Sequence, residues 1–146
     1  MPPLIARLLD HTAFVVLARI VLTFPFWSSG LAKLIPFSNG VAEMQMFGLE
    51  PAWLFNAAVI ATQLGGSLLI ILNRGAWLGA GALAVFTVLT IPIAHRFWEL
   101  DGEKAMMEFF FVIEHIGLIG GLMVTAALAP RTADLRPASL RPALEG

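Results

Sequence analysis

The stretch QLGGSLLIILNRGAWLGAGALAVF, Gln63 to Phe86, decides the fold of this chain. Two strongly apolar runs meet at the short polar break NRG, where Gly75 supplies the backbone freedom that a tight turn needs. The runs extend outward to Trp53–Leu72 and Ala76–His95, and each is close to the roughly 20 residues that cross a bilayer as a helix. Because so short a break keeps consecutive helices side by side, the stretch predicts an antiparallel helical hairpin in a membrane.

The composition of the whole chain also indicates a membrane protein. Of its 146 residues, 58% are hydrophobic and only 13% are charged, and the mean hydropathy is +0.83. A soluble domain carries about twice that charged fraction. The net charge of −1 excludes a nucleic-acid binder that works by neutralising phosphates. Because there is no cysteine, a redox role would need a bound cofactor, a quinone or a partner subunit.

Two more apolar segments, at about Thr12–Ile35 and Met106–Leu128, complete a set of four spans. The predicted fold is therefore an all-α, integral membrane four-helix bundle, with one transmembrane domain over residues 1–130. Residues 131–146 contain two copies of LRPA and are expected to form a disordered cytoplasmic tail. The segment PFSNGVAEMQMFGLEP, Pro36 to Pro51, is too short to span and predicts a short interfacial helix, with a plain loop as the alternative.

The distribution of Lys and Arg predicts the orientation. Basic residues on the side that holds both termini outnumber those on the other side, where most acidic residues lie. The positive-inside rule then places both termini in the cytoplasm, with the chain in a bacterial-type inner membrane. The two basic sets are Arg7, Arg74, Arg131, Arg136 and Arg141 on the cytoplasmic side, and Lys33, Arg96 and Lys104 on the outer side.

Polar side chains within the spans form the candidate site for a ligand or a proton. The depth of each side chain in the membrane can be estimated from a rise of about 1.5 Å per residue. On this estimate, three of the side chains form a column across the bundle and the others line an outer mouth. The column is Arg19, Gln63 and Glu114, and the mouth is Lys33, Asn56, His95 and His115.

Glu114 is expected to face the interior, because it lies within about 60° of both Gly117 and Gly121 on a helical wheel and small residues mark packed faces. An unpaired charge at the bilayer centre costs about 2.5–3.5 kcal/mol on insertion scales. We therefore expect Arg19 and Glu114 to pair across the bundle as a structural contact, bridged by Gln63 or a water. Other interpretations remain open: a proton relay or polar wall of a quinone or small-ligand site, an unpaired and neutral Glu114, or charges that extend to the membrane surface.

The histidines argue against haem and metal chemistry. The rise per residue places His95 and His115 at depths that differ by about 10 Å, too far apart to share one haem. Glu114 and His115 are adjacent, so their side chains diverge by about 100° and do not suit one metal ion. The sequence thus predicts no metal site and no covalently bound cofactor, and leaves a quinone open. No residue is assigned a catalytic role, so whether the chain is itself an enzyme stays open.

The order and spacing of several segments resemble the DoxX family of small four-helix membrane proteins. The resemblance begins at Arg19 and covers most of the chain. Its further pieces are SGLAKLIPF (Ser29–Phe37), MQMFGLEP (Met44–Pro51), QLGGSLLIILNRG (Gln63–Gly75), His95 and the pair Gly120–Gly121. The chain departs from the family pattern at Gln63, where a Glu is frequent, and at Glu114–His115, where Lys-Asn is frequent.

The resemblance implies a membrane subunit or a quinone-interacting partner of a redox or oxidative-stress complex, because similar proteins include subunits of a thiosulfate–quinone oxidoreductase and of an oxidative-stress complex. Two other classes remain open: a transporter or ligand-binding membrane protein with a polar cavity, and a membrane scaffold. The expected partners are the lipid bilayer and membrane or soluble redox subunits. A homo-oligomer is also open, and nucleic acid is excluded.

Overall fold

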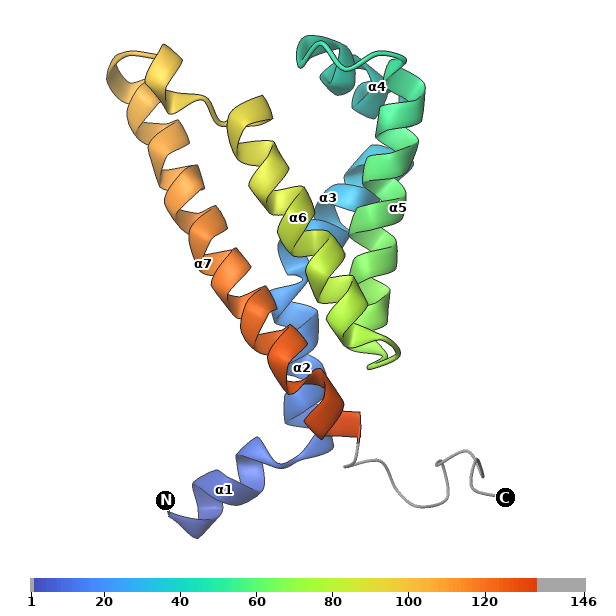
Figure 1. The fold of residues 1–146 in the computed structure, drawn as a ribbon, viewed down its shortest axis with the longest axis vertical. Helices are drawn as coiled ribbons and strands as arrows, with labels where there is room; N and C mark the ends of the chain where they lie inside the picture. The colour runs from blue at the N-terminus through green and yellow to red at the C-terminus, as the bar shows by residue number, and fades with distance from the viewer. Residues whose placement is uncertain (1, 134–146) are drawn as a thin grey trace.

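The computed structural model describes residues 2–133 and confirms the predicted all-α membrane fold (Figure 1). Within this part of the chain, three helices are long and apolar enough to cross a membrane, or four if one bent pair counts as a single span. The elements are α1 (Pro3–Leu9), α2 (Thr12–Leu22), α3 (Phe24–Leu34), α4 (Phe37–Met46), α5 (Ala52–Ile71), α6 (Ala76–Ala94), the 3₁₀ turn η1 (Phe97–Glu99) and α7 (Gly102–Ala133).

Two differences from the predicted elements lie at the ends of the chain. The helix α1 has no predicted counterpart, and none of its residues is buried. The last helix, α7, continues to Ala133 and so takes in the first residues of the predicted tail. The remainder of that tail, residues 134–146, lies outside the described residues.

The hairpin of α5 and α6 forms as predicted. Its turn uses left-handed backbone conformations at Asn73 and Gly75, with φ of 54° and 70°. The amide of Arg74 donates to the carbonyl of Leu69 at 3.1 Å, which closes the end of α5. A side chain at Gly79 would lie against the backbone of α5, so the two helices approach as closely as glycine allows.

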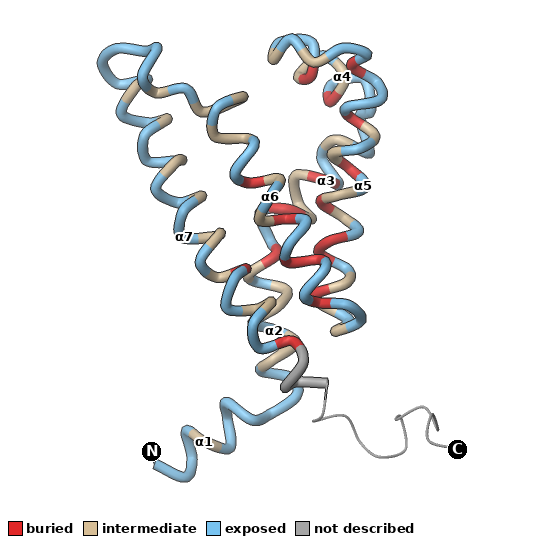
Figure 2. The backbone as a smooth tube through the Cα atoms, viewed as in Figure 1, coloured by how far each residue is buried: buried red, intermediate tan, exposed pale blue. Residues whose placement is uncertain are grey.

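The buried core lies near the hairpin turn and draws on four helices. Phe26 of α3, Ile70 of α5, Ala80 and Leu83 of α6 and Leu122 of α7 form one apolar cluster. Figure 2 shows the buried residues gathered where α3, α5 and α6 meet, and Figure 1 shows α5 and α6 diverging away from the turn. Packing therefore fixes one half of the bundle and leaves the other half splayed.

The first span is broken near its middle. The helices α2 and α3 meet at an angle of 56°, with Thr23 between them and Pro25 in the first turn of α3. Proline has no N–H to donate, so a continuous helix would lose a hydrogen bond there. Carbonyls at the end of α2 find local partners: the carbonyl of Arg19 accepts from the Thr23 amide at 3.0 Å and from Thr23 Oγ1 at 2.7 Å, and that of Ile20 accepts from Trp27 Nε1 at 3.2 Å. The bend is thus satisfied within the chain.

The short helix predicted between the first two spans is confirmed as α4. It ends before Gly48, whose φ of 70° stops the helix in the way that glycine commonly does. The buried Asn56 of α5 fastens its start, because Nδ2 donates to the carbonyl of Phe37 at 3.3 Å. A Cβ at Gly40 would collide with the Asn56 amide, and Met44 is 4% exposed. The helix therefore lies directly against α5.

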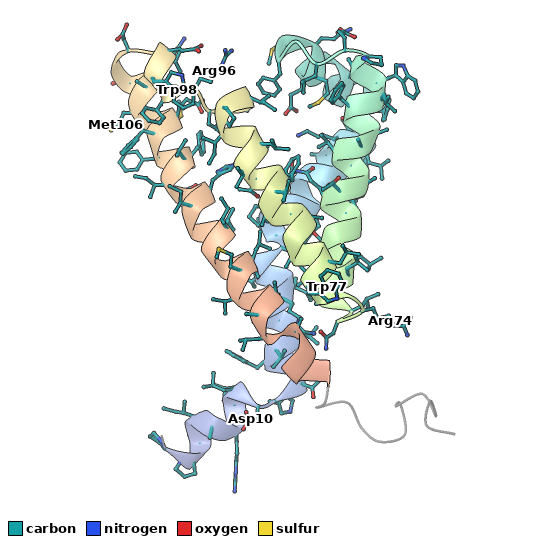
Figure 3. All side chains as sticks on the ribbon, in the orientation of Figure 1. Asp10, Arg74, Trp77, Arg96, Trp98 and Met106 are labelled. Carbon is teal, nitrogen blue, oxygen red and sulfur yellow. The ribbon has the colours of Figure 1, made fainter. Side chains whose placement is uncertain are left out.

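The outer surface of the helices has the features of a membrane protein, both at the two ends that would lie at the membrane interfaces and in the apolar region between them. Figure 3 shows Arg74 and Trp77 at one end of the bundle and Arg96 and Trp98 at the other. Both tryptophans are more than half exposed, as in the aromatic belts at membrane interfaces. Between these ends, only 6% of the most apolar window of α7 is buried inside the chain. That much exposed apolar surface needs a bilayer around it.

Candidate functional site

A cleft of about 690 Å³ lies between α3, α4 and α5 on one side and α6 and α7 on the other. It forms where the helices diverge, because the core near the hairpin turn leaves this half unfilled. Its walls are mostly apolar and include Phe26, Phe55, Phe86 and Leu118. The volume falls within the roughly 300–1,000 Å³ of small-molecule sites. Two groups of polar side chains interrupt the apolar lining.

The first group, the lysine cluster, consists of Ser29 and Lys33 of α3, Glu43 of α4 and Gln63 of α5. Lys33 Nζ lies 3.1 Å from Ser29 Oγ and 3.1 Å from Glu43 Oε2, so it joins α3 to α4. Gln63 Nε2 donates to the same Ser29 oxygen at 3.3 Å, which adds α5. Gln63 is 5% exposed, and its Oε1 has no hydrogen-bond partner within residues 2–133.

The second group, the histidine cluster, consists of His95 at the end of α6 and Glu108 and His115 of α7. His95 Nδ1 lies 2.7 Å from Glu108 Oε2, and the two imidazole rings are in edge contact with centroids 4.6 Å apart. His115 Nδ1 lies 2.7 Å from the carbonyl of Phe111, one turn earlier in α7. A carbonyl can only accept, so Nδ1 of His115 carries hydrogen. The cluster joins α6 to α7 at the wall opposite the lysine cluster.

The structure brings four of the predicted site residues to this one cleft. Lys33, His95 and His115, three of the residues assigned to the predicted mouth, line it, and Gln63 joins them from α5. Asn56 does not line the cleft, because it is fully buried under α4 and holds the start of that helix.

The predicted pairing of Arg19 with Glu114 is wrong. Glu114 is exposed, and no ion pair joins it to Arg19 within the described part of the chain. The helix α2 meets α7 where Gly121 lies against Leu22, seven residues from Glu114 and so roughly 10 Å along α7. Arg19 lies farther along α2 in the opposite direction, because the two helices run antiparallel (Figure 1). Neither residue lines the cleft.

The predicted separation of His95 from His115 is also wrong. Their rings touch, although the rise per residue placed them at depths about 10 Å apart. The estimate took the fourth span to begin near Met106, whereas α7 begins at Gly102 and is 32 residues long.

Three residues of the two polar clusters were not predicted: Ser29, Glu43 and Glu108. A sequence signal existed for Glu108, because it precedes His115 by seven residues and so lies on the same face of a helix. No comparable signal existed for Glu43. Its contact with Lys33 depends on how α4 folds back against α3, and that follows from tertiary packing.

These features define a small, multi-pass α-helical membrane protein with a mostly apolar cleft between its helices, into which two polar clusters are set. The family model of DoxX matches residues 14–96, more than half of the chain. The chain belongs to the DoxX family. The match ends just after His95, so it includes the lysine cluster and leaves out α7 with Glu108 and His115. No curated protein and no solved structure gives a significant match.

Proposed function

We propose that the cleft binds a quinone-type ring compound, and that the chain serves as a membrane subunit or partner of a redox or stress-response complex. The single observation that carries this proposal is the presence of two polar clusters in one apolar cleft, one on α3, α4 and α5 and the other on α6 and α7. A ring with an oxygen at each end matches that arrangement, because each oxygen meets one cluster and the ring contacts the apolar lining between them.

The residues present fit such a ring. Lys33 has three N–H bonds, of which two point to Ser29 and Glu43, so one remains for a ligand oxygen. Phe55 and Phe86 line the same cleft and offer aromatic surface to a ring. The oxygen of Gln63 without a partner is a further sign of a ligand that can donate a hydrogen bond, such as the hydroxyl of the reduced ring, because a buried polar group without a hydrogen bond costs about 1–3 kcal/mol. When bound, a quinone would supply two-electron chemistry, and this chain would hold and orient it.

The proposal places the electron-transfer step in a partner. The chain has no cysteine, and the side chains of the cleft can bind and orient a ring but supply no electrons of their own. A membrane or soluble redox subunit docked near the cleft would exchange electrons with the bound compound. A second copy of the chain is another partner that the exposed face of α7 allows.

We also propose an orientation for the cleft. Both termini would be cytoplasmic in a bacterial-type inner membrane, because the sequence carries five basic residues on the side of the termini and three on the other side. Lys33 and Arg96 then lie toward the outer face, with the cleft in the outer half of the membrane. A lipid-soluble compound could enter from the bilayer without crossing an aqueous phase.

Blocking the cleft tests this proposal. Ala58 is an exposed residue of α5 that lines the cleft, so Ala58→Trp should fill part of it. We expect the affinity for a short-chain ubiquinone, measured by titration of the purified protein in detergent micelles, to fall at least tenfold, about 1.4 kcal/mol. The matched control is Ala61→Trp, an exposed position of the same helix outside the cleft, which should leave the affinity unchanged.

The same pair of variants separates the proposal from its rivals. Equal affinity in Ala58→Trp and the unmodified protein would show that the quinone does not bind in the cleft. If neither protein binds quinone but Ala58→Trp abolishes uptake of a small polar solute into proteoliposomes, the transporter class is correct. Mass spectrometry of lipids and proteins that co-purify with the native protein would identify the bound compound and the partner subunit.

A further inference from the structure

The hydrogen-bonding groups that the cleft leaves unused show a bias toward acceptors. Gln63 Oε1 is one of two buried side-chain polar atoms without a partner in residues 2–133, and the other, Asn56 Oδ1, lies outside the cleft. The Gln63 side chain lines the cleft, and its amide is held from one end by Ser29. The terminal torsion of a glutamine is soft, so a small rotation presents the oxygen to a ligand. A ligand that donates a hydrogen bond would satisfy it.

The histidine cluster shows the same bias on the opposite wall. His95 Nδ1 faces a carboxylate oxygen and His115 Nδ1 faces a carbonyl oxygen, so each Nδ1 carries hydrogen. In a neutral imidazole the other nitrogen, Nε2, is then an acceptor. No hydrogen bond to either Nε2 forms within the described residues. When both rings are neutral, a ring oxygen that meets this wall must therefore donate.

The two walls differ in what they tolerate. The lysine cluster offers the remaining N–H of Lys33 as well as the Gln63 oxygen, so a carbonyl meets only the N–H, whereas a hydroxyl can accept from Lys33 and also donate to Gln63. The histidine cluster with neutral rings offers acceptors alone. A carbonyl placed there would leave two acceptors face to face, which is repulsive, whereas a hydroxyl would be satisfied.

From these free acceptors we infer that the cleft selects the hydroxylated, reduced form of its ring ligand, a quinol, over the corresponding quinone. This inference rests on the proposed function, because it concerns the redox state of the same ligand. Gln63 and His115 are the residues that determine this specificity, one on each wall. Sites built to hydrogen-bond a hydroxyl discriminate strongly against analogues that lack it, because their own polar groups are left unpaired.

The experiment compares three forms of one short-chain ubiquinone with the full-length protein in detergent micelles: the quinone, the quinol kept reduced under argon, and the quinol dimethyl ether. The ether keeps the ring and both oxygens but cannot donate a hydrogen bond. We expect the quinol to bind at least tenfold more tightly than the quinone and the ether. The variants Gln63→Met and His115→Phe should each reduce that ratio to threefold or less, chiefly by weakening quinol binding.

A matched control and a folding check accompany the variants. Gln45→Met makes the same chemical change at an exposed position of α4 outside the cleft and should keep the full ratio. Retained quinone affinity in Gln63→Met shows that the variant is folded, because the quinone needs the cleft but not the added acceptor.

Each outcome decides the inference. A quinone that binds as tightly as the quinol, or more tightly, overturns the inference and leaves the proposed function intact. A preference for quinol that survives both Gln63→Met and His115→Phe overturns the assignment of these two residues. If none of the three compounds binds, the proposed function fails together with the inference.

Discussion

Gly79→Ala is expected to lower the free energy of unfolding by about 1–3 kcal/mol, the usual cost of overpacking a tight contact. A Cβ at this position would lie 2.6 Å from the carbonyl oxygen of Gly66 and 2.9 Å from the Cβ of Leu69. Neither atom can move without shifting the backbone of α5, so the hairpin must open. The measurement is unfolding of the purified protein by titration with a denaturing detergent, followed by circular dichroism.

Gly81→Ala is the matched control for this prediction. It makes the same substitution two residues later in α6, where a Cβ would meet nothing within 4 Å. Alanine is a better helix former than glycine by about 0.8–1.0 kcal/mol, so this variant should be as stable as the unmodified protein or slightly more stable. The two substitutions should thus have opposite signs. Equal effects at both positions would show that the close approach of α5 and α6 does not limit stability.

The contrast between these glycines shows how far sequence reasoning reaches in a membrane helix. Hydropathy and the short NRG break were enough to predict the spans and the hairpin, because both depend on local chain properties. The direction in which a helix faces was harder to predict. Gly117 and Gly121 were taken to mark one packed face, yet only Gly121 meets a neighbour, Leu22, while Gly117 lies in open space. Small residues permit close packing but do not require it.

The error over Glu114 follows from that assignment. The face of α7 that packs is set by Leu118 and Leu122, which contact the buried core, and Glu114 is exposed. In a helix of a soluble protein, the position of the polar face would have shown which side packs against the core. In α7 the residues are apolar on all sides. Lipid and protein contacts both favour such residues, so hydropathy cannot separate the inner face from the outer one. The inner face became clear only from the contacts of the folded chain.

Some of the residues that line the cleft could be predicted from the sequence, because they are ionisable residues in or near apolar spans. Lys33, His95 and His115 are costly in a span, and this cost marked them as interior or interfacial whatever the packing. Their ion-pair partners Glu43 and Glu108 lie in segments at the membrane boundary, where acidic residues are common and carry no such signal. The charge balance of the cleft thus depends on the positions of α4 and the first turns of α7, which the spans alone do not determine.

The ion pair of Lys33 and Glu43 should contribute more to stability than an ordinary surface pair. The side chains are 15% and 37% exposed, and they join α3 to α4 beside the cleft. Exposed pairs contribute about 0.2–1 kcal/mol, whereas breaking a buried pair costs about 3–5 kcal/mol. For this partly buried pair we expect Lys33→Met alone to cost about 1–3 kcal/mol, and Lys33→Met with Glu43→Gln to recover much of that loss. A double-mutant cycle of unfolding free energies measures the coupling.

The pair of Arg96 and Glu99 is the matched control for this cycle. Its atoms are 3.1 Å apart, the same distance, but the side chains are 53% and 50% exposed. Water screens this pair, so its coupling should stay below about 0.5 kcal/mol. If the two cycles give the same coupling, the position of Lys33 and Glu43 at the cleft does not strengthen their attraction, and α4 is held mainly by Asn56 and by the burial of Met44. A larger coupling for Lys33 and Glu43 means that a ligand able to compete for the ammonium group of Lys33 would also loosen α4 from α3.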